Sequence, residues 1–254
     1  MVSLRAADAP VWTTQDYGGE RHLFTVETCR AFVILPPQGK RAETIPWVWY
    51  APAIDGNPRA CLDWLFRNLL EHGVAIAGVD VGETMANPSA RAQFWRFYQE
   101  IRTRFPLDAN ACLLAQSRGG LNQYSFAAAH PLAVRCIVGI YPVLDLRSYP
   151  GLAKAAVAYG YDRAEDLAAH LPDLNPINLL APIARARIPI LHLHGDRDTL
   201  VPIGPNSAAA AENYRALGGE MTLIIVPGKG HQEVPEFFES TELLDFFLRH
   251  ARTR

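Results

Sequence analysis

The sequence predicts an α/β fold with a mostly parallel sheet, an antiparallel edge and helices on both faces. From Ile45 onward, apolar stretches of strand length alternate with stretches whose apolar residues recur at helical spacing. The strand stretches are apolar on both faces, which is typical of parallel strands covered by helices. Two earlier strands, Leu23–Cys29 and Ala31–Leu35, predict a hairpin that adds antiparallel pairing at one edge.

The elements follow one another in a regular order after the hairpin. The expected strands are Ile45–Tyr50, Val74–Val79, one from Ala111 that runs into Ser117, Val134–Ile140, Ile188–His194 and Thr222–Val226. The expected helices cover residues 62–70, 94–105, the stretch from Gly119 to about His130, an Ala-rich stretch before Gly218, and Phe237–Leu248. Candidate polar residues follow several of these strands, and open sheets of this kind bind ligands at the carboxyl ends of their strands.

Residues 1–254 are expected to form a single domain with one cap-like insertion at about 145–187. This interval is rich in proline and too long for a simple connection, so we expect it to pass over the site. Its tyrosines, Tyr149, Tyr159 and Tyr161, either line a pocket or pack a small cap, and packing is the stronger expectation for each of them.

Composition narrows the classes of function. The 254 residues are 49% hydrophobic with a net charge of -2, which is typical of a globular protein and gives no electrostatic case for nucleic acid or a membrane surface. No apolar run has the length that crosses a membrane, and no signal peptide is visible. The chain is expected to be cytoplasmic, or secreted or periplasmic if a signal peptide has been removed. The oligomeric state stays open.

Ser117 is the candidate around which the chain is organised. It stands between a buried strand and a helix, in a turn that exposes its hydroxyl and requires small neighbours. Gly119 meets this requirement on one side, and Ala115 replaces the usual glycine on the other. The alternative is an ordinary strand-to-helix turn in which the serine caps the helix.

A serine hydroxyl needs a base and a group that orients that base. His231 lies in a glycine-flanked loop after the last strand, in Gly-Lys-Gly-His-Gln. Asp196 and Asp198 follow the preceding strand, in His-Gly-Asp-Arg-Asp-Thr-Leu-Val-Pro. The chain order of serine, acid and histidine is the order found in α/β-hydrolases.

Over residues 23–248 the chain resembles the α/β-hydrolase superfamily, and it is most similar to the dienelactone-hydrolase and prolyl-oligopeptidase-like branch. The resemblance rests on the Ser117 turn, on the spacing from His194 to Asp198, and on Gly230-His231. It implies an α/β-hydrolase fold in which Ser117 is the nucleophile, His231 the base and Asp198 the orienting acid. Asp196 and Asp145 are the weaker alternatives for the acid.

The resemblance also implies an oxyanion hole and a substrate pocket. One backbone N–H comes from Arg118, and the second from Tyr50 or Ala51, with Tyr50 favoured. Gln116 and Ala51 are candidate substrate contacts. Trp49 packs in the core by default, or stacks on a sugar or aryl group near the strand end. The Arg118 side chain is expected to pair internally with Asp80 or Glu83.

His192 and His194 are expected to be structural. Their pattern also resembles the start of a zinc motif, but Arg197 stands where that motif has histidine, so no metal is expected. The resulting hypothesis is a cofactor-free serine esterase for a small molecule, such as an acetylated or feruloylated carbohydrate. A prolyl-oligopeptidase-like peptidase, a lipase and a non-catalytic binding protein of the same fold remain as alternatives.

Overall fold

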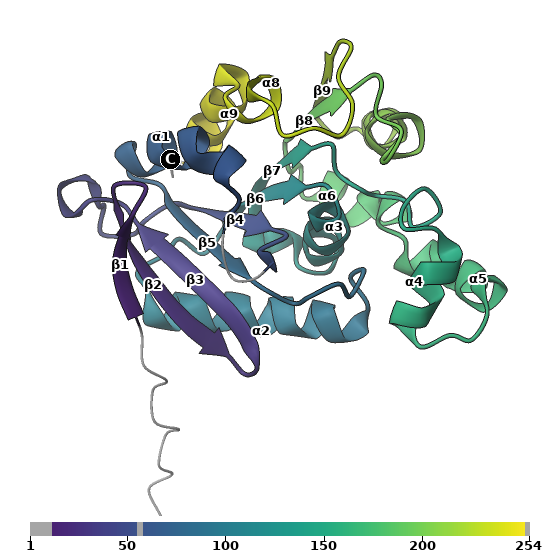
Figure 1. Ribbon diagram of the computed structural model, residues 1–254, viewed down its shortest axis with the longest axis horizontal. Coiled ribbons are helices and arrows are strands. Elements are labelled where there is room, and N and C mark those ends of the chain that lie inside the picture. Colours follow the sequence, from purple (N-terminus) through teal and green to yellow (C-terminus); the bar gives the residue numbers. More distant parts are fainter. Residues whose placement is uncertain (1–11, 55–57, 252–254) are drawn as a thin grey trace, which may run out of the picture.

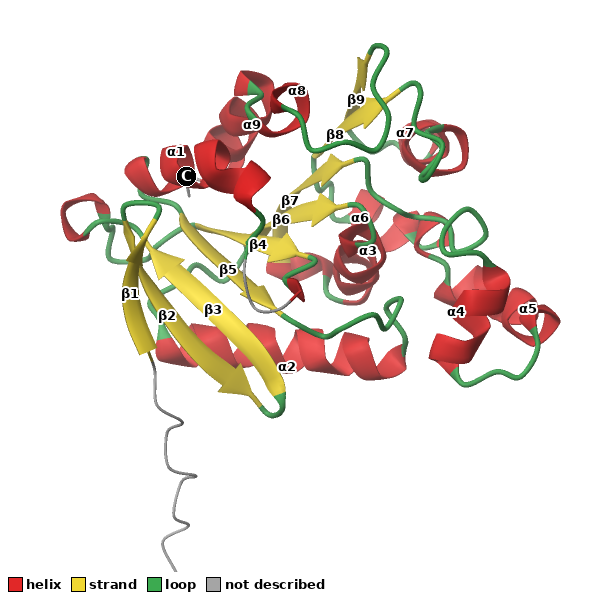
Figure 2. Ribbon diagram, viewed as in Figure 1, coloured by secondary structure: helices red, strands yellow, loops and turns green. Residues whose placement is uncertain are grey.

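A computed structural model describes residues 12–54 and 58–251, which form a nine-stranded sheet with helices on both sides (Figure 1 and Figure 2). The strands are β1 (Trp12–Asp16), β2 (Gly19–Val26), β3 (Cys29–Leu35), β4 (Trp47–Ala51), β5 (Ala75–Val79), β6 (Ala111–Gln116), β7 (Val134–Ile140), β8 (Ile190–Gly195) and β9 (Met221–Val226). The α-helices are α1 (Asp63–Glu71), α2 (Pro88–Arg104), α3 (Gly119–Ala129), α4 (Leu152–Tyr159), α5 (Ala164–Leu174), α6 (Leu180–Arg185), α7 (Ala209–Ala216), α8 (Pro235–Phe238) and α9 (Thr241–Ala251).

The sheet is antiparallel at one edge and parallel elsewhere, in the order β1-β2-β3-β5-β4-β6-β7-β8-β9. Strands β1 to β3 pair antiparallel with one another, and β3 pairs antiparallel with β5. Every pair from β4 to β9 is parallel. The predicted fold class is therefore confirmed. The sequence did not predict β1, because its five residues, Trp-Thr-Thr-Gln-Asp, are mostly polar.

Alternate residues of the central strands supply two apolar clusters, one on each face of the sheet. Trp47 and Trp49 of β4 belong to the cluster that α2, α3, α6 and α7 cover. Val48 and Tyr50 belong to the cluster that α1, α8 and α9 cover. This division follows from the two-residue side-chain period of a strand. It explains why β4 carries five consecutive buried residues, since both of its faces are covered by helices.

The interval between β7 and β8 forms α4, α5 and α6, and Figure 1 shows α4 and α5 at one side of the molecule, beyond α3. Leu167 and Leu171 of α5 pack in a third apolar cluster together with Leu121 of α3 and Val201. The side chain of Asn175 fastens the interval at its base, because Oδ1 accepts from the backbone N–H of Leu146 at 3.0 Å. The interval is thereby held beside the carboxyl ends of the strands.

The closing helix differs from the expectation of one helix over 237–248. It is divided into α8 and α9, and Ser240 lies between them. The hydroxyl of Ser240 accepts from the backbone N–H of Leu243 at 3.2 Å, so this serine starts a new helix as an N-cap. In the described residues, we find no helix whose length and hydrophobicity would let it cross a membrane.

Candidate active site

Ser117 occupies a sharp turn between β6 and α3. Its backbone has φ of 50°, in the left-handed region that a non-glycine residue adopts only when its surroundings impose it. Here the conformation is imposed by hydrogen bonds to both the N–H and the carbonyl of Ser117. Its N–H donates to the Ile140 carbonyl at 3.0 Å, and its own carbonyl accepts from Gly120 N–H at 2.9 Å and Val143 N–H at 2.8 Å. The turn is fixed to β7 and to the segment after it, so the position of the hydroxyl is fixed as well.

Gly119 is required by the close approach of α3 to the end of β4. A Cβ at this position would collide with the carbonyl oxygen of Ala51. Ala115, at the position where the usual motif has glycine, lies inside β6, where it is fully buried and pairs with Ala51 of β4. The turn therefore has its glycine where α3 begins, and alanine is small enough at the buried strand position before Ser117.

The hydroxyl of Ser117 heads a line of two hydrogen bonds. Its Oγ lies 2.9 Å from Nε2 of His231, and Nδ1 of His231 lies 2.8 Å from Oδ2 of Asp198. The other oxygen of Asp198 accepts from the backbone N–H groups of Leu200, at 3.0 Å, and Val201, at 2.8 Å. In this arrangement His231 donates from Nδ1 to the carboxylate and accepts from the serine at Nε2.

Two loops are held together so that His231 reaches Asp198. Arg197 N–H donates to the Lys229 carbonyl at 2.9 Å, and Gly228 N–H donates to Oδ1 of Asp196 at 2.7 Å. Gly195 allows the close contact, because a Cβ there would collide with the carbonyl of Lys229. Asp196 thus ties the loop of the histidine to the loop of the acid.

Asp198 is ionised in this setting. Burial alone would raise the pKa of Asp198, but the nearby His194 imidazole and the hydrogen bonds from His231 and the Val201 N–H outweigh burial and hold the pKa well below its usual range. The carboxylate can therefore stabilise a positive charge that develops on His231. The alternative acid, Asp145, is occupied elsewhere, since it accepts from the Arg147 guanidinium at 3.0 Å and from the Asn175 amide at 2.8 Å.

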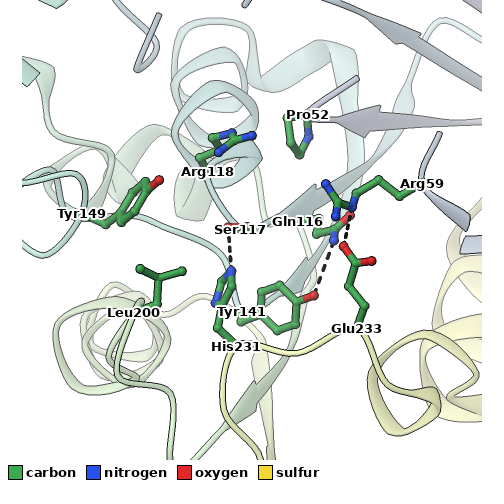
Figure 3. A pocket seen from close by; sticks show the side chains of 10 residues that line it. All are labelled: Pro52, Arg59, Gln116, Ser117, Arg118, Tyr141, Tyr149, Leu200, His231 and Glu233. Atoms are coloured by element: carbon green, nitrogen blue, oxygen red, sulfur yellow. Dashed lines mark hydrogen bonds and ion pairs between the residues drawn. The ribbon is translucent and has the colours of Figure 1, made fainter. Parts of the chain in front are cut away.

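The Ser117 hydroxyl opens on a cavity of about 340 Å³ (Figure 3). Ten residues line it: Pro52, Arg59, Gln116, Ser117, Arg118, Tyr141, Tyr149, Leu200, His231 and Glu233. Figure 3 shows Tyr149 and Leu200 on one side of Ser117, and Arg59 and Glu233 on the other. The ring of Tyr141 packs against the His231 ring, with 4.2 Å between the two centroids. In Figure 3 it lies beside His231 and below Ser117.

The charged side chains around the cavity form ion pairs. Arg59 pairs with Glu233, both of them lining residues, across one side of the cavity. Arg118 pairs with Glu83 at 2.9 Å, as the sequence predicted for one of two acids. The other acid, Asp80, lies 3.4 Å from Arg30 instead. The two arginines of the cavity wall are therefore each neutralised by a glutamate of the same protein.

Trp49 packs in the core, which was its default expectation, and the structure overturns the alternative of a substrate contact. It is fully buried, and its ring lies 5.8 Å from Trp47 and 4.8 Å from Phe94. The predicted contact with substrate is wrong, because α2 and α3 cover the face of β4 from which this side chain projects. Its indole acts in the core, where large aromatic side chains contribute much of the apolar burial.

Gln116 lines the cavity, and both ends of its amide contact tyrosines. Oε1 accepts from the Tyr50 hydroxyl at 2.9 Å, and Nε2 lies 3.4 Å from the Tyr141 hydroxyl. Tyr50 and Ala51 are buried within β4, and the residue of this segment that lines the cavity is Pro52. Arg118 directly precedes α3, so its backbone N–H has no acceptor within the helix.

Sequence reasoning missed five lining residues, one of which, Pro52, directly follows the end of β4. Tyr141, Leu200 and Glu233 lie one or two positions beyond a strand end or a candidate catalytic residue, so proximity along the chain could have found them. Arg59 has no such signal, because it lies in a long connection after β4. Tyr149, for which packing was the stronger expectation, does line the cavity.

His192 and His194 are fully buried, as a structural role requires. Both contact the hydroxyl of Ser207, at 2.9 Å and 2.7 Å. Within residues 12–54 and 58–251, no group of three or more His, Cys, Asp or Glu side chains is arranged to hold a metal ion.

Comparison with solved structures identifies the fold first. S-formylglutathione hydrolase from Agrobacterium tumefaciens superposes with a TM-score of 0.74 at 18% identity, over 96% of this chain and 99% of that one. A truncated carbohydrate esterase from gut microbiota gives 0.69 at 20% identity, over 96% and 97%. A putative dipeptidyl aminopeptidase IV from Bacteroides ovatus gives 0.67 at 15% identity, over 95% of this chain but 35% of that one. The fold is that of the α/β-hydrolases.

The family follows from the sequence itself. Residues 96–254 match the prolyl oligopeptidase family, and the chain belongs to this family of serine hydrolases. The chain spans about a third of the length of the dipeptidyl aminopeptidase it resembles. A comparison with curated proteins found no significant match.

Proposed function

We propose that this serine hydrolase cleaves carboxylic esters of small molecules, with Ser117 as the nucleophile. The observation that carries the proposal is the hydrogen-bonded line from Ser117 through His231 to Asp198, with its serine end open to the cavity. A line of this kind gives a weak nucleophile a base and fixes the tautomer of that base.

The reaction has two halves. Ser117 Oγ attacks the acyl carbon while His231 Nε2 takes the hydroxyl proton, and His231 returns this proton to the leaving alcohol oxygen as the C–O bond breaks. Water then attacks the acyl-enzyme by the same route and releases the acid. Asp198 stabilises the positive charge that forms on His231 in both halves.

The oxyanion of each tetrahedral intermediate is assigned to backbone donors. Arg118 N–H is the first, since it lies at the positive end of α3 beside Ser117. The second is assigned to the end of β4, at Tyr50 in preference to Ala51. Each such donor contributes on the order of 3 kcal/mol to stabilisation of the transition state.

The pairing of charges at the cavity favours a neutral ester over a peptide with a free amino terminus. A peptide amine needs an unpaired carboxylate, but Glu233, the one acid of the cavity wall in the described residues, is paired with Arg59. Tyr149 and Leu200 offer apolar surface for an acyl or alcohol group. An acetylated or feruloylated carbohydrate remains our proposed substrate, supported by the similarity to a carbohydrate esterase.

Peptide hydrolysis is the second candidate, and the match to the prolyl oligopeptidase family favours it. A panel of p-nitrophenyl acetate, feruloyl esters, acetylated sugars and aminoacyl p-nitroanilides separates the two. Ester cleavage that exceeds amide cleavage by several orders of magnitude supports the proposal, and efficient cleavage of the anilides contradicts it.

The direct test is hydrolysis of p-nitrophenyl acetate by the wild type, Ser117→Ala and Ser125→Ala. Ser125 is a buried serine of α3 and serves as the matched control. We expect Ser117→Ala to lose activity by a factor on the order of 10⁴ or more, and Ser125→Ala to retain it. Equal activity in the wild type and Ser117→Ala would contradict the assignment. A wild type with no activity on any ester or amide would favour a binding protein of this fold.

A further inference from the structure

Four buried polar side chains form a row that starts beside Asp198 and leads away from the cavity. The hydroxyl of Tyr124 lies 2.6 Å from Nε2 of His192, and Nδ1 of His192 lies 2.9 Å from Oγ of Ser207. Oγ of Ser207 also lies 2.7 Å from Nδ1 of His194. All four residues have 0% exposure. We call them the buried chain, and none of them lines the cavity.

The fold brings these residues together from three elements. His192 and His194 alternate along β8, so both project from the same face of the sheet. Tyr124 comes from α3, and Ser207 from a π-helical turn at Gly204–Ala208. Such turns are rare and often occur at functional sites. This one places a single hydroxyl between two imidazoles.

The direction of every hydrogen bond in the buried chain follows from its two ends. At one end, Nε2 of His194 lies 2.8 Å from the carbonyl of Val201, which can only accept, so Nε2 carries a hydrogen. If His194 is neutral, its Nδ1 accepts from Ser207, and Ser207 accepts from Nδ1 of His192. Nε2 of His192 then accepts from the hydroxyl of Tyr124.

Tyr124 fixes this direction from the other end. Within the described residues, His192 is the hydrogen-bond partner of its hydroxyl. A doubly protonated His194 would donate from Nδ1 to Ser207. Either each bond of the buried chain then reverses and the Tyr124 hydrogen loses its acceptor, or Ser207 accepts from both imidazoles and its own hydrogen loses its acceptor. A buried donor without an acceptor costs about 1–3 kcal/mol, so the buried chain opposes protonation of His194.

The imidazole of His194 lies next to the carboxylate of Asp198. Its Nε2 lies 3.6 Å from Oδ2 of Asp198, the oxygen that accepts from His231. Its partner Val201 holds the other oxygen of Asp198 through the backbone N–H. A positive charge on His194 would compete with His231 for the same carboxylate.

We propose that the buried chain positions the catalytic carboxylate, because it keeps His194 neutral and so leaves the charge of Asp198 to His231. This inference rests on the proposed function of the Ser117 site. His194 is a positioning residue in this scheme, and Tyr124 acts through His192 and Ser207. Among the described residues, the titratable groups that face the buried chain are Asp198, which lies beside His194, and Tyr214 of α7, which acts on Tyr124.

Burial supports the neutral state of the inner histidine. It lowers the pKa of His192 to about 3, and the neighbouring His194 acts in the same direction. Burial also raises the pKa of Tyr124, with Tyr214 as a second cause, so the phenol keeps its hydrogen. His192 and Tyr124 therefore keep the same hydrogens at every pH at which the enzyme would work.

Tyr124→Phe and Tyr214→Phe form a matched pair for the test. The Tyr214 hydroxyl is also buried and donates to the Ile188 carbonyl at 2.6 Å, without a path to Asp198. For p-nitrophenyl acetate we expect Tyr124→Phe to lower kcat about tenfold with KM unchanged, and to shift the acidic limb of the pH profile of kcat. Tyr214→Phe should keep both kcat and the pH profile. Equal effects of the two variants would overturn the proposal.

Proton NMR provides a readout that does not depend on activity. The hydrogen between His231 Nδ1 and Asp198 gives a far-downfield resonance, identified by its loss in Asp198→Asn. We expect this resonance to shift in Tyr124→Phe and to stay in place in Tyr214→Phe. An inactive wild type with this pattern would reject the proposed function but support the positioning role of the buried chain. An unshifted resonance in Tyr124→Phe would reject that positioning role alone.

His194→Gln and His194→Leu complete the experiment. Glutamine can donate to Val201 and accept from Ser207, as the neutral imidazole does, whereas leucine can do neither. We expect His194→Gln to retain most of the wild-type kcat and His194→Leu to lose at least tenfold, with both proteins checked for folding by circular dichroism. Equal kcat losses in two folded variants would contradict a positioning role.

Discussion

Two hydrogen-bonded lines converge on Asp198, and they differ in their surroundings. One ends on its carboxylate, and the other ends on the carbonyl of Val201, whose N–H donates to that carboxylate. The outer line, from Ser117 through His231, borders the cavity, where a substrate would enter. The inner line is the buried chain from Tyr124 to His194, whose four side chains have no exposed surface. The outer line is suited to moving a proton, because one end is open to a reacting group. The inner line is suited to keeping its protons fixed, because each donor already has one acceptor. One carboxylate thus serves a mobile line and a fixed line.

The largest effect is expected where the two lines converge. Asp198→Asn removes the charge and allows His231 the wrong tautomer, so kcat for p-nitrophenyl acetate should fall by a factor on the order of 10⁴. Asp196→Asn is the matched control, since Asp196 lies outside both lines and the asparagine oxygen can still accept from Gly228 N–H, which keeps the two loops together. Steady-state kinetics of the two variants check this. Similar losses in both would mean that Asp198 has no special relation to His231.

The inner line should make the protein sensitive to acid. His192 is neutral in the folded protein down to a pKa of about 3, whereas in the unfolded chain it takes up a proton near pH 6.5. Because the unfolded state then binds more protons, the free energy of unfolding should fall by about 4 kcal/mol between pH 6.5 and about 3.5. Asp198, whose pKa is lowered, adds a loss of the same sign only below its ordinary value of 3.8.

Urea unfolding of the wild type and His192→Gln over this pH range measures the effect. The variant should show a flatter dependence of unfolding free energy on pH, even if it is less stable at pH 7. Parallel pH dependences in the two proteins would mean that His192 is not held neutral by the fold.

The outer line depends on the turn that carries Ser117. Gly119→Ala places a methyl group against the Ala51 carbonyl, so either the turn or the end of β4 must shift. Small misplacements of catalytic groups cost about 100-fold in rate, and we expect a loss of kcat of this size. Gly39→Ala is the control, because a Cβ there meets nothing within 4 Å. A Gly119→Ala enzyme with wild-type kcat would show that the close packing of α3 on β4 does not set the position of the serine.

The smallest effect concerns the cavity beside the outer line. Glu233→Gln leaves Arg59 without its acidic partner, so substrates with a carboxylate should gain. We expect the ratio of kcat/KM for p-nitrophenyl hemisuccinate to that for p-nitrophenyl butyrate to rise about tenfold, which corresponds to about 1.4 kcal/mol. Glu236→Gln breaks an ion pair with Lys229, and neither of these residues lines the cavity, so it should leave the ratio unchanged. An unchanged ratio in Glu233→Gln would show that the ion pair does not select for charge.

The two lines also differ in how far the sequence predicted them. The outer line was predicted in two steps. Parallel strands bring their carboxyl ends to one edge, which placed Ser117, the acids and His231 together, and the resemblance to the α/β-hydrolases selected Asp198 among the acids. The inner line was predicted only as two structural histidines. Its other members, Tyr124 and Ser207, come from helical elements, and their contacts depend on helix packing and on a π-helical turn that no sequence pattern indicated.

The cavity wall was predicted least well, again for a physical reason. The position of Trp49 near the end of its strand left a substrate contact open beside its default role in the core, and the cover by α2 and α3 decides for the core. Arg59 and Glu233 are far apart in the chain, and their pairing depends on where two connections run. Side chains set by strand ends were therefore predictable, and side chains set by the paths of connections were not.

The central claim is that Ser117 is an activated nucleophile, and reaction with a fluorophosphonate tests it most directly. Intact-mass measurement should show one phosphonyl group added to the wild type, at Ser117 after peptide mapping, and none added to Ser117→Ala. Modification of another residue, or none in a folded wild type whose cavity admits the reagent, would contradict the account.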